Sequence, residues 1–313
     1  MPNMFVVREI PERYLSGAWE PDDDSSLPDY YFSDSMTSVA EARGWWQRGD
    51  PFDFTAIYSY GEYENKYYSG RRIWRALNLF APSLNLAAEY DDPLRVRAAY
   101  PMSVKPDELV GVRDVMAMHR DTYAGTPFDL AADGDLAGGA WGLPFRFDPE
   151  LAYDGAVPGA WERPIGSFRT TYTVINQARS AAAGGGQGNV GGVVYFAPHC
   201  SPGSAFIPLF AAALAAGDAA NLPSHSFASD PRKHDAASAF WAHRFATNVA
   251  FARWRDMSKD IGALQTKWED AGESLVRRLD AEATASLSSS SSPLTASPSV
   301  GRAGPVLCAG LGP

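Results

Sequence analysis

Two neighbouring residues, His199 and Cys200, carry the groups that a thiol nucleophile and its general base would use. A thiolate attacks a carbonyl carbon once a base such as an imidazole has taken its proton. However, adjacent residues on a strand point to opposite faces, so this pair is poorly placed for proton transfer. The other cysteine, Cys308, lies in a tail rich in Ser, Pro and Gly. The sequence therefore argues against Cys200 as a nucleophile.

Widely used catalytic and binding motifs are missing from the sequence. It contains no H-E-x-x-H, no G-x-S-x-G, no Walker A motif and no complete EF-hand loop. Gly186, Gly188 and Gly191 match G-x-G-x-x-G, but a strand is expected after them where a dinucleotide site needs a helix. A total of 2 cysteines also excludes a disulfide framework and a cysteine zinc site.

Residue patterns in the N-terminal part predict helices mixed with strands. In chain order they predict a strand over 3–10, a loop over 11–34, and short helices over 35–46 and 68–79. The next helix is expected within 104–123, where Gly111 is a plausible N-cap and Asp114 follows three residues later. His119 lies on the apolar face of this helix, and we interpret it as a packed histidine.

The C-terminal part predicts a hairpin followed by long helices. In chain order we expect strands over 167–177 and 190–196, a Gly-rich hairpin loop over 181–189, and helices over 234–279. Apolar side chains recur at helical spacing in the last segment, at Trp254, Met257, Ile261, Leu264 and Trp268. Residues 281–313 are poor in apolar side chains, so we expect them to form a disordered tail after a single domain over 1–280.

Charge and composition exclude several classes of partner. The chain has 313 residues and a formal net charge of -10, which disfavours nucleic acid because phosphate backbones are also negative. No apolar run reaches the roughly 20 residues that cross a membrane. No Asn begins an N-x-Ser/Thr sequon, which favours the cytoplasm over secretion, although the compartment stays undetermined. A homo-oligomer is left open.

Six stretches, taken in order, resemble the N-terminal-nucleophile cysteine dipeptidases of the dipeptidase A and secernin-like family. They are NMFVVREI at 3–10, FDFTAIYSYGEYENKYYSGRRIWRA at 52–76, YPMSVKPDELVGVRDVMAMHRDTYAGTPFDL at 100–130, GAWERPIGSFRTTYTVINQAR at 159–179, GGVVYFAPH at 191–199 and SAFWAHRFATNVAFARWRDMSKDI at 238–261. The resemblance covers roughly residues 3–265. Each stretch is short, but their order and spacing together are specific.

The resemblance implies an α+β chain with the αββα sandwich of N-terminal-nucleophile hydrolases, followed by helices. It also implies that a cysteine at the processed N-terminus attacks the peptide carbonyl and that its own α-amine acts as the base. No metal or cofactor is needed. The family cysteine lies upstream of the segment that resembles NMFVVREI, so we expect this chain to be N-terminally incomplete and inactive alone.

The same resemblance suggests which residues meet the substrate, a dipeptide or short peptide. Asn3 falls on a family Asn that is expected to donate a hydrogen bond to the oxyanion. Arg169 and Thr170, expected on the first strand of the hairpin, would face the substrate, and a guanidinium suits its carboxylate. His199 occupies a family-like position after the partner strand, and a role in the turn is favoured over a catalytic one.

Two other readings stay open. The chain is alternatively a non-catalytic, secernin-like interaction protein that keeps the scaffold without the nucleophile. A weaker alternative is an amide hydrolase of the bile-salt or penicillin amidase type, which shares the fold. Peptide binding without turnover would favour the first alternative, and turnover of acyl amides but not dipeptides would favour the second.

Overall fold

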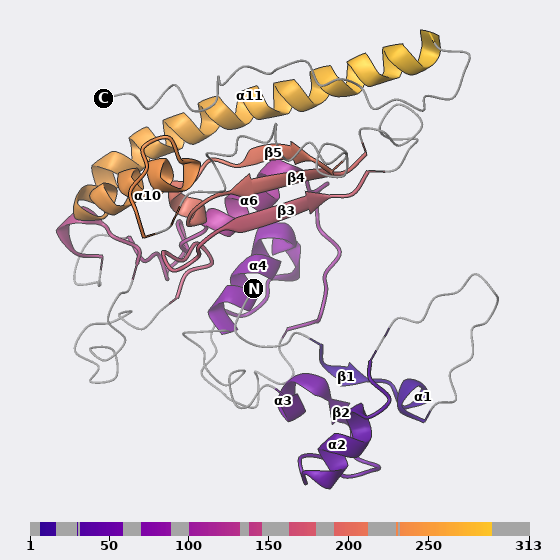
Figure 1. Cartoon of the computed structure of the whole chain (residues 1–313). Helices are drawn as coiled ribbons and strands as arrows, with labels where there is room; N and C mark the ends of the chain where they lie inside the picture. The colour runs from indigo at the N-terminus through magenta and orange to yellow at the C-terminus, as the bar shows by residue number, and fades with distance from the viewer. Residues whose placement is uncertain are drawn as a thin grey trace. The chain divides into compact units, whose positions relative to one another are not determined.

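The protein folds as two compact units (Figure 1). Unit 1 comprises Met1–Val110 with Trp161–Ile165, and unit 2 comprises Gly111–Ala160 with Gly166–Pro313, where the sequence predicted one domain over 1–280. The structure is a computed structural model, and it describes residues 7–16, 30, 32–58, 70–88, 100–131, 138–145, 163–179, 191–211, 230 and 232–289. Within these ranges no helix is both long and apolar enough to cross a membrane.

Unit 1 is built from short elements, and those before residue 59 enclose a largely aromatic core. The elements are β1 (Glu9–Ile10), α1 (Glu12–Leu15), α2 (Met36–Ala42), β2 (Phe52–Asp53), α3 (Phe54–Tyr58), α4 (Arg71–Phe80) and the 3-10 helix η3 (Pro82–Leu84). Strand β1 pairs antiparallel with β2, which places Ile10 opposite Phe52. Both side chains are buried with Tyr14, Met36 and Trp46. This buried cluster packs α2 against the two strands.

The helices predicted in unit 1 are present, while its loops and strand differ from the prediction. Helices α2 and α4 confirm the segments expected over 35–46 and 68–79. The loop prediction is wrong at α1, because one helical turn there buries the ring of Tyr14 against Tyr30, with ring centroids 5.1 Å apart. The strand predicted over 3–10 is present at Glu9–Ile10, and residues 3–6 lie outside the described residues.

Unit 2 contains an antiparallel sheet with the strand order β3-β4-β5. The described elements of the unit are α6 (Val112–Arg120), η4 (Gly139–Trp141), β3 (Thr173–Gln177), β4 (Val193–Ala197), η5 (Ser201–Gly203), β5 (Ile207–Phe210), α10 (Ala239–Ala250), η7 (Phe251–Arg253) and α11 (Trp254–Ser289). Alternate side chains of β3 and β4 are buried, so one face of the sheet lies in the core.

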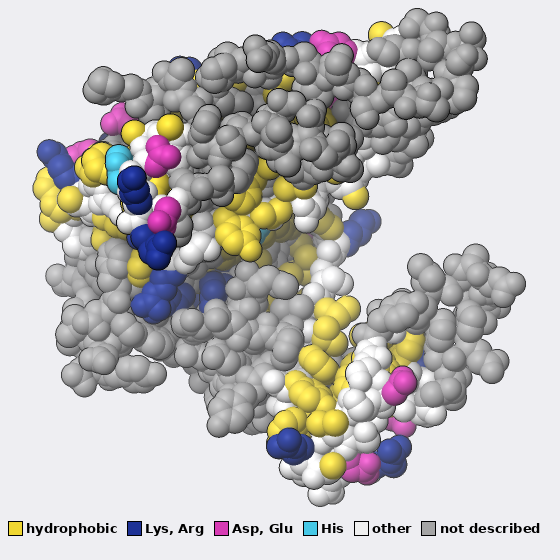
Figure 2. Space-filling view, in the orientation of Figure 1, with side chains coloured by type: hydrophobic (Ala, Val, Ile, Leu, Met, Phe, Trp, Pro, Cys, Tyr) yellow, Lys and Arg dark blue, Asp and Glu magenta, His cyan; other side chains and the backbone are white. Residues whose placement is uncertain are grey.

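Helices α6 and α11 cover the buried face of this sheet (Figure 1). Met116 of α6 and Val276 of α11 join one cluster with Ile175, Val193 and Tyr195 from the strands. The opposite face keeps apolar side chains in contact with solvent: Tyr172 is 60% exposed and Val174 is 38% exposed. Figure 2 shows hydrophobic side chains on the surface near these strands. The sheet is therefore apolar on both faces but covered by described helices on one.

The hairpin and the helix cap of unit 2 confirm the sequence prediction. β3 and β4 pair antiparallel as expected, and the Gly-rich stretch 181–189 between them lies outside the described residues. Gly111 is the N-cap of α6, and its backbone N–H donates to the Asp114 carboxylate at 2.8 Å. Only this half of a capping box forms, because glycine has no side chain to complete it.

Two boundaries in unit 2 were predicted incorrectly. The helical region expected over 234–279 begins at Ala239 and is interrupted by the 3-10 turn η7. Helix α11 then continues to Ser289, past residue 280 where the disordered tail was expected to begin. Residues 290–313 lie outside the described residues. Asp280 helps to explain the extension, because it pairs with Arg179 at 2.6 Å and so holds α11 beside the hairpin.

Candidate functional site

A buried loop, residues 199–205, joins β4 to β5 and carries both His199 and Cys200. The Cys200 side chain is 0% exposed, and burial raises the pKa of its thiol to about 11. A thiol with so high a pKa stays protonated at neutral pH and is a poor nucleophile. The geometry therefore agrees with the expectation that Cys200 is not the attacking group.

The His199 ring is enclosed in the same loop. It is 4% exposed, and neither ring nitrogen has a hydrogen-bond partner among the described residues. Phe240 of α10 contacts the ring edge to face, with centroids 5.9 Å apart. Burial, together with the nearby positive charge of Arg244, lowers the pKa of His199 to about 4. The resemblance placed His199 among the residues near the substrate and favoured a role in the turn. The structure shows its imidazole buried and packed against Phe240.

Side chains from two helices hold the loop through its carbonyl groups. The Arg120 guanidinium donates to the carbonyl of Ser201 at 3.1 Å and to that of Ser204 at 2.8 Å. The Gln265 amide donates to the carbonyls of Pro202 and Ser204, each at 3.0 Å. A buried carbonyl without a donor is costly, so these contacts fix the path of the loop.

A buried carboxylate, Glu269 of α11, lies at the centre of this arrangement. Its side chain is 2% exposed and pairs with Arg120 and, at 3.0 Å, with Arg113 of α6. It also accepts a hydrogen bond from the backbone N–H of Phe206 at 2.9 Å. Its partners lie on α6 and directly before β5, so we interpret this ion cluster as structural.

Arg169 and Thr170, predicted to lie on a strand, lie in a turn that precedes β3. The backbone N–H of Thr170 donates to the carbonyl of Ser167 at 3.2 Å, and the N–H of Arg169 reaches the Ser167 hydroxyl at 3.3 Å. The strand prediction over 167–177 is wrong here, because these local bonds occupy the N–H groups that a ladder would use. Arg169 is exposed, with its guanidinium over the Phe168 ring at 5.5 Å.

The predicted site residues therefore differ in accessibility. Arg169 is open to solvent and can meet a ligand, whereas His199 is enclosed. Asn3, the predicted oxyanion donor, lies outside the described residues. In the part of the chain that is described, no group of three or more His, Cys, Asp or Glu side chains could hold a metal ion.

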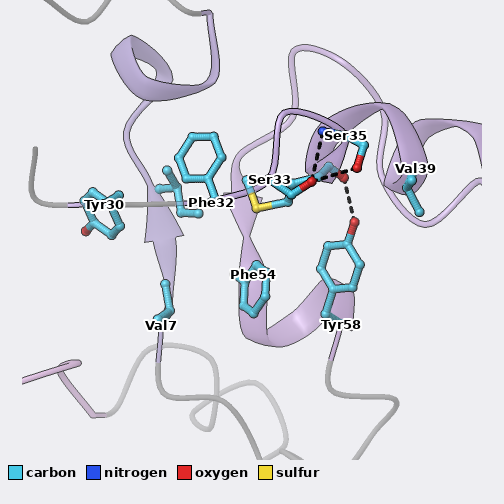
Figure 3. Close-up of a pocket in the computed structure, with 10 residues that line it drawn as sticks. Val7, Tyr30, Phe32, Ser33, Ser35, Val39, Phe54 and Tyr58 are labelled. Atoms are coloured by element: carbon cyan, nitrogen blue, oxygen red, sulfur yellow. Dashed lines mark hydrogen bonds between the residues drawn. The ribbon is translucent and has the colours of Figure 1, made fainter.

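A pocket of about 460 Å³ opens in unit 1 (Figure 3). The described residues that line it are Val7, Ile10, Tyr30, Phe32, Ser33, Ser35, Met36, Val39, Phe54 and Tyr58. In Figure 3, Val7, Phe54 and Tyr58 lie on one side of the pocket, opposite Phe32 and Ser33. None of these lining residues is charged. No motif in the sequence predicted this pocket, although the aromatic spacing in FDFTAIY at 52–58 was a signal that could have pointed to it.

The polar groups of this pocket are largely satisfied by one another. The Tyr58 hydroxyl donates to the carbonyl of Met36 at 2.6 Å. The hydroxyls of Ser33 and Ser35 lie 2.8 Å apart, and the Ser35 N–H donates to the Ser33 hydroxyl at 3.3 Å. The phenyl ring of Phe54 stacks on Tyr58, with centroids 4.9 Å apart. The interior is thus apolar, with hydroxyls on exposed residues at its edge.

Comparison with known families decides the class of protein. The model of peptidase family C69 matches residues 11–267. The chain belongs to peptidase family C69. This is the dipeptidase A and secernin-like family of cysteine peptidases, so the resemblance noted in the sequence is confirmed. No curated protein matches the chain.

Membership of C69 implies a hydrolase that cleaves peptide bonds with a cysteine thiol. The mixture of helices and small antiparallel sheets agrees with a C69 peptidase. Among the described residues Cys200 is the one cysteine, and its burial does not suit this chemistry. Cys308 lies outside the described residues. The C69 match covers residues of both units.

Proposed function

We propose that this C69 member is a cysteine-type dipeptidase that hydrolyses dipeptides and short peptides. The observation that carries the proposal is the family match over residues 11–267. In the proposed reaction, the thiolate of an N-terminal cysteine attacks the peptide carbonyl and forms a thioester as the amine of the second residue leaves with a proton. Water then hydrolyses the thioester and releases the first residue and the thiol.

The sheet of unit 2 supports the fold expected for this chemistry. Helices α6 and α11 cover one face of β3-β4-β5, and the other face carries exposed apolar side chains such as Tyr172 and Val174. A sheet with two apolar faces is typical of a layered sandwich. We propose that this sheet is one of the two layers in an αββα arrangement.

Arg169 is the described residue best suited to bind the carboxylate of a short peptide. Its guanidinium is exposed and its backbone is fixed by the turn at Ser167. A guanidinium pairs with a carboxylate through two parallel hydrogen bonds. Asn3 as oxyanion donor stays a prediction.

The test is an assay of the protein purified from its own cells, with its N-terminus determined by mass spectrometry. We expect hydrolysis of dipeptides and an N-terminal cysteine. The variant Cys200→Ala should keep kcat within about twofold, because the buried, protonated thiol does not react. Loss of turnover in a folded Cys200→Ala protein would overturn this account of the nucleophile.

The variant Arg169→Ala reports on carboxylate binding in the same assay. We expect KM to rise about tenfold or more with kcat nearly unchanged, because a hydrogen bond between charged groups is lost. Arg232→Ala is the matched control, since Arg232 is also an exposed arginine of unit 2 and its ion pair among the described residues is a local one, with Asp230 at 3.0 Å. Binding of dipeptides without any turnover would instead favour a non-catalytic, secernin-like protein.

A further inference from the structure

The pocket of unit 1 has the size and chemistry of a binding site. Its volume of about 460 Å³ falls within the usual range of small-ligand pockets. The wall consists of aromatic and aliphatic side chains, and the described lining residues include no charge. Such a site favours an uncharged apolar group, because a carboxylate or ammonium would lose its water without gaining a partner.

The polar atoms around the pocket strengthen this selectivity. Tyr58 uses its hydroxyl hydrogen on the Met36 carbonyl, and Ser33 and Ser35 bond to each other. One serine hydroxyl hydrogen remains for a ligand, at the exposed edge of the pocket and not in its apolar interior. The exposed residues Phe32 and Val39, which are 37% and 40% exposed, leave the pocket open to solvent.

We propose that this pocket binds one apolar side chain, aromatic or branched aliphatic, of a short peptide. The inference rests on the proposed function for the identity of the ligand as a peptide. Val7 in the wall follows Asn3, the predicted oxyanion donor, by four residues, which span at most about 14 Å of chain. A side-chain pocket at that chain distance gives the peptidase a preference for hydrophobic residues.

The experiment measures binding of N-acetyl-phenylalanine amide, N-acetyl-leucine amide and N-acetyl-aspartate amide to the full chain by calorimetry. These probes lack the free termini of a dipeptide, so binding is measured apart from hydrolysis. The phenylalanine and leucine probes should bind, and the aspartate probe should bind about tenfold more weakly or worse. Equal binding of the three probes, or no binding of the apolar probes, would overturn the proposal.

Two variants place the binding in this pocket. Val39→Arg puts a charged side chain at the opening, and Val39 is exposed enough to accept the change without unfolding. We expect this variant to lower the affinity for the phenylalanine probe about tenfold or more. Val249→Arg, at a valine of α10 that is 46% exposed, is the matched control and should bind as the wild type does.

Phe32→Ala gives a second variant that removes part of the wall without adding charge, and it should also weaken the apolar probes. Unchanged affinity in both folded pocket variants would overturn the assignment. If the probes bind as expected but the purified protein hydrolyses no dipeptide, the proposed reaction fails while the pocket stands. If dipeptides are hydrolysed with no preference for apolar residues and the probes do not bind, the pocket proposal fails alone.

Discussion

His199 is a buried histidine whose ring nitrogens have no partner among the described residues. Such a ring can stay in the core only as the neutral imidazole, because a buried imidazolium would need a compensating charge or water. Burial accordingly lowers its pKa from 6.5 to about 4. His199 therefore links the stability of the fold to pH.

This pKa shift predicts a loss of stability in acid. Above pH 6.5 His199 is neutral in both folded and unfolded chains, but between 6.5 and about 4 only the unfolded chain takes up the proton. The free energy of unfolding should fall by roughly 3 kcal/mol across this window. Urea unfolding should show a smaller fall for His199→Phe than for the wild type. Parallel pH profiles of the two proteins would contradict this.

Two glycines should respond in opposite ways to the same substitution. A Cβ on Gly203 would lie 1.9 Å from the Thr247 hydroxyl oxygen, whereas a Cβ on Gly262 of α11 would meet nothing within 4 Å. Thr247 is fully buried and cannot move aside easily. We expect Gly203→Ala to destabilise the protein by roughly 3 kcal/mol. Gly262→Ala should stabilise it by roughly 1 kcal/mol, because alanine favours the helix. Thermal melts that shift in the same direction would refute this contrast.

At the scale of elements, one carboxylate joins α6, α11 and the strand β5. Glu269 pairs with Arg113 and Arg120 and accepts the N–H of Phe206, which directly precedes β5. Removing one member of a buried ion cluster leaves the other charges without compensation. The loss of Glu269 would therefore weaken the packing of α6, α11 and β5 together.

Glu269→Gln should therefore destabilise the protein by roughly 3–5 kcal/mol. The matched control is Asp256→Asn on the same helix, whose carboxylate is 50% exposed and pairs with Arg253 at 2.9 Å. This surface substitution should lower the free energy of unfolding by less than about 1 kcal/mol. Chemical unfolding of the two variants measures the difference. Similar losses for both would mean that burial does not set the strength of the Glu269 pairs.

The elements with strong local patterns were predictable from the sequence. Each of these patterns lies within a single element. The helical face around Ile73 and Trp74 identified α4, the Gly111 cap identified α6, and the β-branched residues of β3 identified the hairpin. Boundaries were less predictable because they depend on single contacts. The turn at Ser167 removes Arg169 from the strand, and the pair of Asp280 with Arg179 accompanies a longer α11.

The candidate site was predictable only in part, because it depends on residues far apart in the chain. Arg120 and Glu269 meet across 149 positions, which no local pattern reveals. The pocket of unit 1 likewise brings Val7 together with Phe54 and Tyr58. The sequence already argued against Cys200 as a nucleophile, because it directly follows His199. The burial of the Cys200 thiol was not predictable from the sequence.

At the scale of the whole molecule, residues that follow the end of the family match still contribute to the core of unit 2. The match ends at residue 267, within α11, whereas Glu269 and Val276 of the same helix complete the core of unit 2. The later turns of α11 are therefore part of the folded unit. The composition after residue 280 therefore did not indicate that the helix continues to Ser289.

The loop over residues 199–205 has a consequence for how the chain folds during synthesis. Its side-chain hydrogen bonds join positions between 61 and 84 residues apart, with Arg120 before the loop and Gln265 after it. Contacts so distant in sequence form slowly, since the intervening chain must first be ordered. The loop cannot be fixed until α11 has left the ribosome, so unit 2 would stay open on the nascent chain while α6 and the hairpin are already made.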